Sequence, residues 1–248
     1  MKDKRQYHIG LAPGEAGRYV LLPGDPGRVP LIAQHFEKAE KIAQNREYVT
    51  YTGYLNGVKV SAVSTGIGCP SAAICLEELV RVGADTFIRV GSCGSLQDQI
   101  ALGDLVISTA TVRDDGTSRD YVPISYPAVA DRKIVAALET AALKLGHPHH
   151  VGITHTKDAF FIEEAHLMPQ MEELRRRWEI YRAANVLATA MEASALFVVA
   201  SIRKVRCGEI LAVYGNTFGH QPIMKKKGME EAIQTALEAV KILAEGEK

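Results

Sequence analysis

The chain has 248 residues, 47% of them hydrophobic and 23% charged, and its 29 Lys and Arg residues balance 29 Asp and Glu residues. This composition is typical of a globular protein and lacks the basic excess of most proteins that bind nucleic acids or acidic membranes. Glu192 interrupts the most apolar stretch, residues 186–202, so no transmembrane helix is predicted. The charged first residues lead into no apolar signal core, and we therefore expect a cytoplasmic protein without membrane or nucleic-acid partners.

The first half of the chain alternates short apolar runs with helical patterns. Strands are predicted over residues 18–22, 48–55, 58–64 and 86–90, and helices over residues 29–36 and 70–82. Asn56-Gly57, between the second and third of these strands, is a strong signal for a two-residue hairpin turn. The last strand is expected to end where Gly91-Ser92-Cys93-Gly94 begins.

The second half continues the alternation. Strands are predicted over residues 104–109, 151–156 and 209–213, and helices over residues 131–145, 163–178, 188–203 and 228–244. The helix over 163–178 is charged and expected on the surface, whereas the helix over 188–203 is apolar and expected to be buried. No linker, repeat or low-complexity run divides the chain, so the pattern predicts a single α/β domain over residues 1–248, with a central mixed twisted sheet flanked by helices on both faces.

Small residues gather where three of the predicted strands end, in Gly24-Asp25-Pro26-Gly27, Gly66-Ile67-Gly68 and Gly91-Ser92-Cys93-Gly94. Ligands of α/β sheets bind at the carboxyl ends of strands. Asp25 is a candidate N-cap with Pro26 as first helical residue, an arrangement that leaves backbone N–H groups free for an anion. Arg28 and Arg89 add positive charge nearby, which favours a phosphate site. Such turns are also common for structural reasons, so each loop alone leaves both interpretations open.

The sequence contains no motif for several other chemistries. It has no Walker lysine, no complete dinucleotide-binding fingerprint, no H-E-x-x-H and no G-x-S-x-G. The four cysteines form no C-x-x-C pair and are expected to be reduced thiols. Met191-Glu192 is more informative, because a carboxylate in an apolar helix must be paired or face a cavity. Glu192 is either a structural glutamate or a carboxylate that binds sugar hydroxyls, with Met191 against the apolar face of the sugar.

Five segments follow one another along the chain: Gly24-Asp25-Pro26-Gly27-Arg28, Asn45-Arg46-Glu47-Tyr48, Ser64-Thr65-Gly66-Ile67-Gly68, Ile88-Arg89-Val90-Gly91-Ser92-Cys93-Gly94 and Met191-Glu192. In this order they resemble the nucleoside phosphorylase-I family. Residues 111–113 and 127–131 are typical of its uridine phosphorylase branch, to which hexameric purine nucleoside and methylthioadenosine phosphorylases are close. The resemblance implies a pentosyltransferase of nucleoside salvage that uses inorganic phosphate as co-substrate and needs no other cofactor. Its products would be a free base and ribose 1-phosphate.

The resemblance also assigns roles to individual positions. Phosphate binding is implied for Gly24, Arg28, Arg89 and Ser92 of one subunit and Arg46 of its neighbour. Nucleoside binding is implied for Phe160 at the base, for Met191 and Glu192 at the ribose, and for His8 of the neighbour at the ribose 5′-hydroxyl. Catalysis would depend on Arg89 and Glu192. Some members hold a monovalent cation such as potassium between subunits, at positions that match Glu47, Ile67 and Ser71. The resemblance therefore implies a homo-oligomer, a hexamer built from dimers.

The positions that contact the base depart from the family pattern. Glu164 and His166 stand where uridine phosphorylases have Gln and Arg, and we expect them to accept from and donate to the base. Residues 214–217 lack both a further arginine of those enzymes and the aspartate of purine enzymes, and Ala190 replaces the usual acid before Met-Glu. Uridine is the expected substrate. The alternatives are a purine nucleoside or methylthioadenosine phosphorylase, a hydrolytic nucleosidase, which would not need three arginines, and a non-catalytic nucleoside-binding relative.

Overall fold

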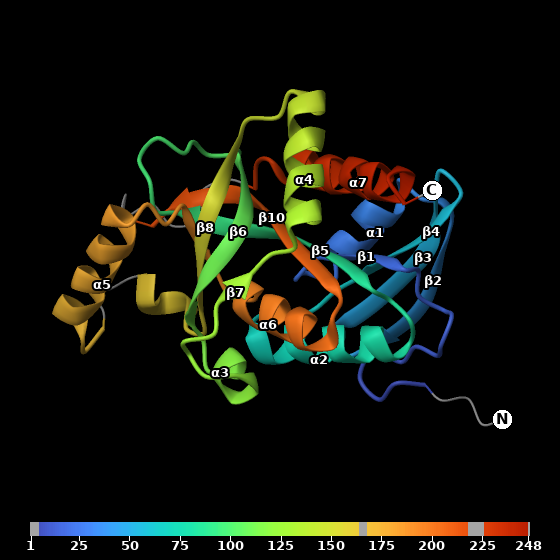
Figure 1. Ribbon diagram of the computed structural model, residues 1–248, viewed down its shortest axis with the longest axis horizontal. Coiled ribbons are helices and arrows are strands. Elements are labelled where there is room, and N and C mark those ends of the chain that lie inside the picture. The colour runs from blue at the N-terminus through green and yellow to red at the C-terminus, as the bar shows by residue number, and fades with distance from the viewer. Residues whose placement is uncertain (1–4, 164–167, 218–225, 248) are drawn as a thin grey trace.

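The computed structural model describes residues 5–163, 168–217 and 226–247. Its first half contains β1 (Tyr19–Leu22), α1 (Arg28–Ala33), β2 (Glu37–Asn45), β3 (Tyr48–Leu55), β4 (Val58–Val63), α2 (Cys69–Arg81) and β5 (Thr86–Ser95). The second half contains β6 (Leu105–Asp114), α3 (Thr117–Tyr121), β7 (Ala128–Val129), α4 (Arg132–Leu145), β8 (His149–Lys157), the short 3₁₀ helix η1 (Phe160–Glu163), α5 (Met171–Ala183), β9 (Ala188–Ala190), α6 (Ala193–Arg203), β10 (Arg206–Asn216) and α7 (Met229–Glu245). The predicted α/β class is confirmed (Figure 1).

The strands form a mixed sheet in the order β10-β6-β8-β9-β5-β1-β4-β3-β2, with β7 beside β6. β10 also pairs with β5 in parallel, so that β5, β9, β8, β6 and β10 close into a ring. The strands β1, β4, β3 and β2 extend from this ring as an open, twisted sheet (Figure 1). Leu22 at the end of β1 and Glu209 of β10 both lie in register with Arg89 of β5, so Arg89 stands where the open sheet joins the ring.

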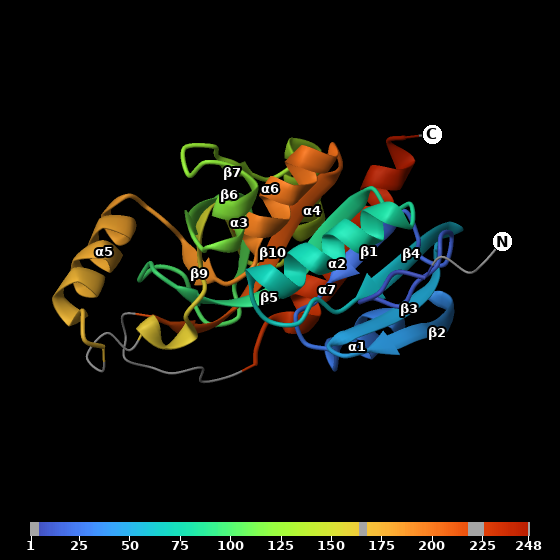
Figure 2. The same ribbon diagram turned by 90° about the horizontal axis from the view of Figure 1, so that it is seen from below.

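Helices cover both faces of the sheet. α4 and α7 pack on each other and on one face, while α2 and α6 pack on the other, as Figure 2 shows from below. Alternate residues of β5 serve the two cores: Ile88 and Val90 pack on the α4–α7 side and Phe87 on the α2–α6 side. α5 stands at the end of the molecule farthest from β2 (Figures 1 and 2), and it packs through Leu174 and Trp178. Among the residues described, no helix is long and apolar enough to cross a membrane.

Two elements that border the site differ from the sequence prediction. The strand predicted to end at residue 90 continues to Ser95, because the small residues 91–94 stay in the ladder with β10. The helix predicted over 188–203 is a short strand, β9, followed by α6 from Ala193. β9 pairs with β5 and β8, and its three-residue length gave no periodicity to detect.

Two surface elements also differ. The strand β2 was not predicted, because it is an exposed edge strand whose charged sequence, EKAEKIAQN, shows no alternation. The helix predicted over 163–178 is α5, which begins at Met171 and runs to Ala183. Its buried side chains, Leu174 and Trp178, lie one turn apart and define the face that docks on the sheet.

Candidate active site

A cavity of about 1010 Å³ opens where β5, β9 and β10 meet the loops that follow β1 and β8. Seven residues that the sequence assigned to phosphate, ribose or base line it: Gly24, Arg28, Arg89, Ser92, Phe160, Met191 and Glu192. They come from segments that lie far apart in the sequence, from Gly24 to Glu192. The fold therefore brings together in one cavity residues that the sequence analysis had grouped only by their resemblance to one family.

Arg89 is the buried cation of this cavity, with 4% of its surface exposed. Its Nη2 forms an ion pair with Oε2 of Glu192, and its Nη1 lies 3.3 Å from Oε1 of Glu209. Burial disfavours a cation, but the two carboxylates outweigh this effect and raise the pKa of Arg89. Its Nε and Nη1 make no hydrogen bond within the described ranges. Arg89 is thus a fixed positive charge with N–H donors left for a ligand.

Gly91 makes room for Arg89. The two residues are two apart on β5 and so lie on the same face of the strand. A Cβ on Gly91 would lie 2.6 Å from Cζ of Arg89, closer still to Nη1, and 2.8 Å from Cδ2 of Leu211. The glycine is therefore required by the path of the guanidinium, not by a loop, since this segment is a strand.

Arg28 supplies a second positive charge from the start of α1. Its Nη2 lies 3.5 Å from Oγ of Ser92, and its Cζ is 5.8 Å from the ring centroid of Tyr214. Gly24 precedes this helix, and a Cβ there would lie 3.2 Å from the carbonyl oxygen of Gly66. Two arginines and a hydroxyl thus face one side of the cavity, a combination suited to an oxyanion.

The N-cap predicted at Asp25 is wrong, because α1 begins at Arg28 and Gly27 occupies the cap position. Asp25 Oδ1 instead accepts from the Gly27 N–H at 2.8 Å. The N–H groups of Arg28 and Val29 donate to carbonyl oxygens of Asp25 and Pro26 within the turn. Since the turn uses these donors, the side chains of the arginines and Ser92 must carry most of any anion binding on this side.

Glu192 lies at the N-cap of α6 and not inside a helix, which corrects its predicted place. It is 4% exposed. Oε1 accepts from the Gly68 N–H at 3.0 Å, and Oε2 accepts from the Met191 N–H at 3.1 Å and pairs with Arg89. The carboxylate therefore has structural partners and also lines the cavity, so both interpretations of this residue agree with its position.

The residues of the site that sequence reasoning missed include Lys157, Thr189 and Tyr214, which line the cavity, and Glu209, which lies beside Arg89. Lys157 ends β8 and is 2% exposed. Its Nζ donates to Oγ1 of Thr189 at 3.0 Å. The predicted strand stopped one residue short of this lysine, and Thr189 was placed in a helix. A charged residue directly after a buried strand was the available signal. Glu209 gave no such signal, because it opened a predicted strand of otherwise apolar residues.

His8 and Arg46 are predicted site residues that do not line this cavity. His8 Nδ1 lies 2.7 Å from Oε1 of Glu78. Arg46, with φ of 52° in the turn between β2 and β3, places its Cζ 6.0 Å from the ring centroid of Tyr7. Asn45 Nδ2 donates to the His8 carbonyl oxygen at 2.8 Å. The two residues therefore share one surface region of the subunit, outside its own cavity.

The three residues assigned to a monovalent cation also line the cavity. Ser71 Oγ donates to Oε1 of Glu47 at 2.9 Å. A backbone hydrogen bond and the Ser71 hydroxyl, against a smaller opposing effect of burial, lower the pKa of Glu47, so its carboxylate is ionised. Ile67 is 77% exposed beside them. An ionised carboxylate with a neighbouring hydroxyl fits a hard cation, which prefers oxygen ligands. Glu164 and His166 lie outside the described residues.

Comparison with known proteins places the chain in a family. The family model described as "Phosphorylase superfamily" matches residues 18–245. The chain is 48% identical to a uridine phosphorylase of Treponema pallidum (96% of this chain and 94% of that protein) and 46% identical to one of Thermococcus kodakarensis (98% and 88%). A guanosine phosphorylase of Halorubrum lacusprofundi is 38% identical (96% and 99%). The crystal structure of uridine phosphorylase from Vibrio fischeri superposes with a TM-score of 0.86 at 31% identity (96% and 98%).

A cavity lined by a buried arginine–glutamate pair and by Phe160 and Met191 has room and polarity for an oxyanion beside an organic substrate. The chain belongs to the phosphorylase superfamily, over nearly its whole length. It is a nucleoside phosphorylase, a pentosyltransferase whose substrates are a nucleoside and phosphate.

Proposed function

We propose that the protein catalyses reversible phosphorolysis of uridine to uracil and ribose 1-phosphate. The observation that carries this proposal is the direct pairing of Arg89, on the anion side of the cavity, with Glu192, on the side lined by Met191. Because these two side chains are in direct contact, the proposed phosphate subsite and the proposed sugar subsite adjoin each other. The bacterial and archaeal relatives that are uridine phosphorylases support the choice of base.

Arg28, Arg89, Ser92 and the backbone at Gly24 hold the phosphate in this proposal. The glycosidic bond breaks ahead of attack, so positive charge develops on the ribose, as in glycoside cleavage. The phosphate dianion lies under that charge, and charge-assisted hydrogen bonds from the guanidinium groups keep it there. Catalysis is then positioning and fixed electrostatics, without a covalent enzyme intermediate.

Glu192 and Met191 hold the ribose. The Glu192 carboxylate accepts from the vicinal hydroxyls and stabilises the cationic sugar, and Met191 packs on its apolar face. Phe160 packs on the base, and Glu164 and His166 bind its polar edge. Support for this arrangement comes from the cavity, which Phe160, Met191 and Glu192 line together.

His8 and Arg46 complete the site of a neighbouring subunit, so the active form is a homo-oligomer, a hexamer built from dimers. Their shared surface region outside the cavity of their own subunit supports this role. Glu47, Ile67 and Ser71 hold a potassium ion at the same subunit boundary. The Glu47–Ser71 hydrogen bond supports this site, because it already orients two oxygen ligands.

We place the reaction in nucleoside salvage in the cytoplasm. The four cysteines support a reducing compartment, since each is buried and none of them forms a disulfide. Burial raises the pKa of the Cys69, Cys75 and Cys207 thiols, which makes them poor nucleophiles.

A second candidate substrate is guanosine, because the Halorubrum relative is a guanosine phosphorylase. A panel of uridine, cytidine, guanosine, inosine and adenosine, assayed at saturating phosphate by base release, separates the two. We expect uridine to have the highest kcat/KM and guanosine a lower but measurable value. A higher value for any purine nucleoside would overturn the uridine assignment, and base release without phosphate would indicate a nucleosidase.

A further inference from the structure

Lys157 is a buried cation that lines the cavity. It takes no part in the proposed contacts to phosphate and ribose. Its side chain is 2% exposed, and its Nζ lies 3.0 Å from Oγ1 of Thr189 and 5.9 Å from the ring centroid of Trp178. A buried ammonium is energetically costly, and it persists in a cavity where it has polar or π partners or a ligand to bind.

A chain of hydrogen bonds fixes the position of this ammonium. Thr189 Oγ1 lies 2.9 Å from Nδ1 of His155, and His155 Nε2 lies 2.9 Å from Oδ2 of Asp114. Burial lowers the pKa of His155 below its ordinary value, so its imidazole is neutral at neutral pH. Burial opposes ionisation of Asp114, but hydrogen bonds from His155 and Tyr181 outweigh it and lower the pKa of this carboxyl.

These protonation states give every bond a direction. A carboxylate only accepts, so His155 must donate from Nε2 to Asp114 and has a bare Nδ1. The Thr189 hydroxyl therefore donates to His155 and accepts from Lys157. Asp114 and His155 thus orient the hydroxyl that anchors the ammonium, and the order of donors admits no exchange of roles.

The order of strands places Lys157 away from the anion side of the cavity. The sheet runs β1-β5-β9-β8. Arg28 follows β1, Arg89 lies on β5, Glu192 follows β9, and Lys157 ends β8. Strands are about 4.8 Å apart, so β8 lies roughly 10 Å from β5. This order matches phosphate, ribose and base in turn, and Phe160 lies three residues beyond Lys157 on the base side.

We propose that Lys157 donates a hydrogen bond to the carbonyl oxygen O4 of uracil, or O6 of guanine, and thereby selects nucleosides with a carbonyl group at this position of the base. This inference rests on the proposed phosphorolysis. As the C1′–N bond breaks and the phosphate–C1′ bond forms, the bonding electron pair moves to the base and spreads onto its carbonyl oxygens. Lys157 keeps its protons and stabilises this charge electrostatically. The leaving uracil anion takes up the proton that the attacking hydrogen phosphate carried, which leaves neutral uracil and the dianion of ribose 1-phosphate. Cytosine and adenine present an amino donor where uracil and guanine have a carbonyl, and an ammonium repels it.

The direct test compares Lys157→Met and Lys157→Gln with the wild type on uridine and cytidine, at saturating phosphate. We expect Lys157→Met to lower kcat/KM for uridine roughly 10- to 100-fold, mainly in kcat, because a hydrogen bond from a charged group is lost. The preference for uridine over cytidine should shrink by a similar factor. Lys157→Gln, which keeps a neutral donor, should lose less. The KM for phosphate should not change, and Lys144→Met, at an exposed lysine paired with Glu238, is the control for loss of a lysine.

Thr189→Val tests the positioning role, because it removes the hydroxyl and keeps the shape. We expect a smaller fall in kcat for uridine than Lys157→Met gives. The double variant should be no worse than Lys157→Met alone, since Thr189 acts through Lys157. If the losses in kcat of the two single variants add up in the double variant, Thr189 acts independently of Lys157, and its positioning role is overturned.

The outcomes separate this inference from the proposed function. A wild-type enzyme that cleaves no nucleoside with phosphate contradicts both. A wild type that cleaves uridine, with Lys157 variants of unchanged kcat/KM and unchanged uridine preference, overturns only the role of Lys157. If Lys157→Met does not fold, as judged by thermal unfolding, Lys157→Gln and Thr189→Val decide the question on the same two substrates.

Discussion

Arg89 illustrates how the site is built at the scale of single residues. The guanidinium lies between Glu192 and Glu209, both nearly inaccessible to water. Burial raises the pKa of Glu209, Arg89 opposes this, and Ser108 donates to its Oε2 at 2.5 Å. Removing one partner of such a buried cluster is far more destabilising than removing a surface charge. The arginine is therefore held by charge on two sides, with Gly91 leaving the space that it occupies.

Gly91→Ala is expected to displace the guanidinium without removing any charge. The added methyl overlaps the present position of Nη1, so Arg89 must shift from the anion side of the cavity. We expect the KM for phosphate to rise roughly tenfold or more, because one charge-assisted hydrogen bond to the phosphate is lost. Steady-state rates over a phosphate titration measure this. Gly116→Ala is the control, because its methyl would lie 3.6 Å from Asp158, an ordinary contact. An unchanged phosphate KM in Gly91→Ala would contradict the role of this glycine.

The sequence predicts those residues of the site that belong to a recognisable motif. It does not predict residues that only the packing of distant strands brings to the site. Arg28 and Arg89 stand beside small residues in recurring patterns, and the cavity contains both. Glu209 is a single acid within an apolar strand, and only the register of β10 with β5 brings it to Arg89. Contacts set by strand register between distant segments leave no local trace in the sequence.

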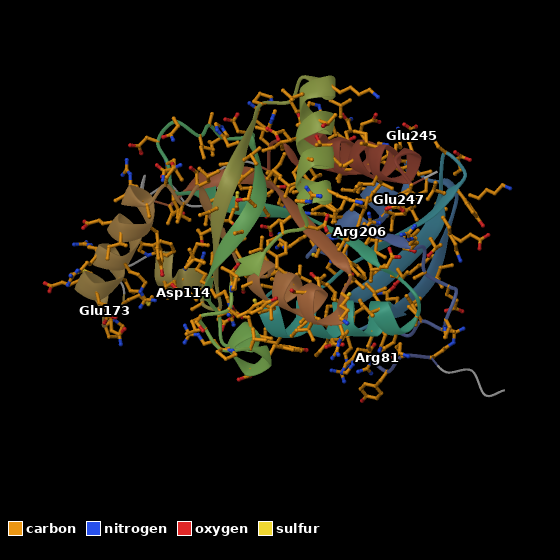
Figure 3. The ribbon with its side chains drawn as sticks, viewed as in Figure 1. Arg81, Asp114, Glu173, Arg206, Glu245 and Glu247 are labelled. Carbon is orange, nitrogen blue, oxygen red and sulfur yellow. The ribbon has the colours of Figure 1, made fainter. Side chains whose placement is uncertain are left out.

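At the scale of elements, α5 is attached to the sheet by a polar cluster around Asp114. Asp114 ends β6 and accepts from Tyr181 of α5 at 2.7 Å and from His155 of β8 at 2.9 Å. Arg177, also on α5, lies 3.4 Å from the same oxygen. Figure 3 labels Asp114 at the end of the molecule where α5 stands. The carboxylate thus connects α5 to the strand that carries Lys157.

Asp114→Asn should lower the free energy of unfolding by about 2–4 kcal/mol at pH 7, because it removes the charge that these donors share. The folded-state pKa of Asp114 lies below its ordinary value. Its contribution is therefore fully present above the unfolded pKa of about 3.9 and is lost as pH falls below it. Urea unfolding at pH 7, 5 and 3.5 measures this.

The difference between wild type and Asp114→Asn should be equal at pH 7 and 5 and smaller at pH 3.5. Asp98→Asn is the control, because this acid is 71% exposed and pairs with Arg182 at the surface. Such a pair contributes about 1 kcal/mol or less. A difference for Asp114→Asn that stays constant down to pH 3.5 would show that its ionisation does not stabilise the fold.

The elements that sequence reasoning misplaced share a physical cause. β5 continues through residues 91–94 because neighbouring strands on the ladder satisfy its backbone, although glycine and serine have low intrinsic strand preference. β9 is three residues long and exists only between β5 and β8. Tertiary pairing overrides local preference in both cases, and both elements border the cavity. Long periodic helices such as α4 and α7 were placed to within about one residue.

At the scale of the whole molecule, the proposed assembly places the surface region that contains His8 and Arg46 at the cavity of a neighbouring subunit. His8 and Arg46 lie outside the cavity of their own subunit, yet the proposed function gives them roles at the ribose and the phosphate. A two-fold arrangement in which each subunit lends these residues to its neighbour resolves this, since isologous contacts exchange the same patch.

Mixing two inactive chains tests that arrangement. Arg46→Ala and Arg89→Ala should each lose most activity alone. After subunit exchange at equal amounts, about one quarter of all pockets would combine an intact Arg89 with an intact Arg46 from the neighbour, so activity should return to about that fraction of wild type. Exchange is followed by mass measurement of tagged chains. Proven exchange without recovered activity would place Arg46 within its own subunit or give it a structural role.

Phosphorolysis is followed directly by ³¹P NMR of the wild-type enzyme with uridine and inorganic phosphate. If the cavity joins a phosphate to a ribose, inorganic phosphate must be consumed and ribose 1-phosphate formed in equal amounts, with one uracil released for each. The reverse reaction, from ribose 1-phosphate and uracil, must regenerate phosphate. Uracil release with the phosphate signal unchanged would show that the enzyme is a hydrolase and would contradict phosphorolysis.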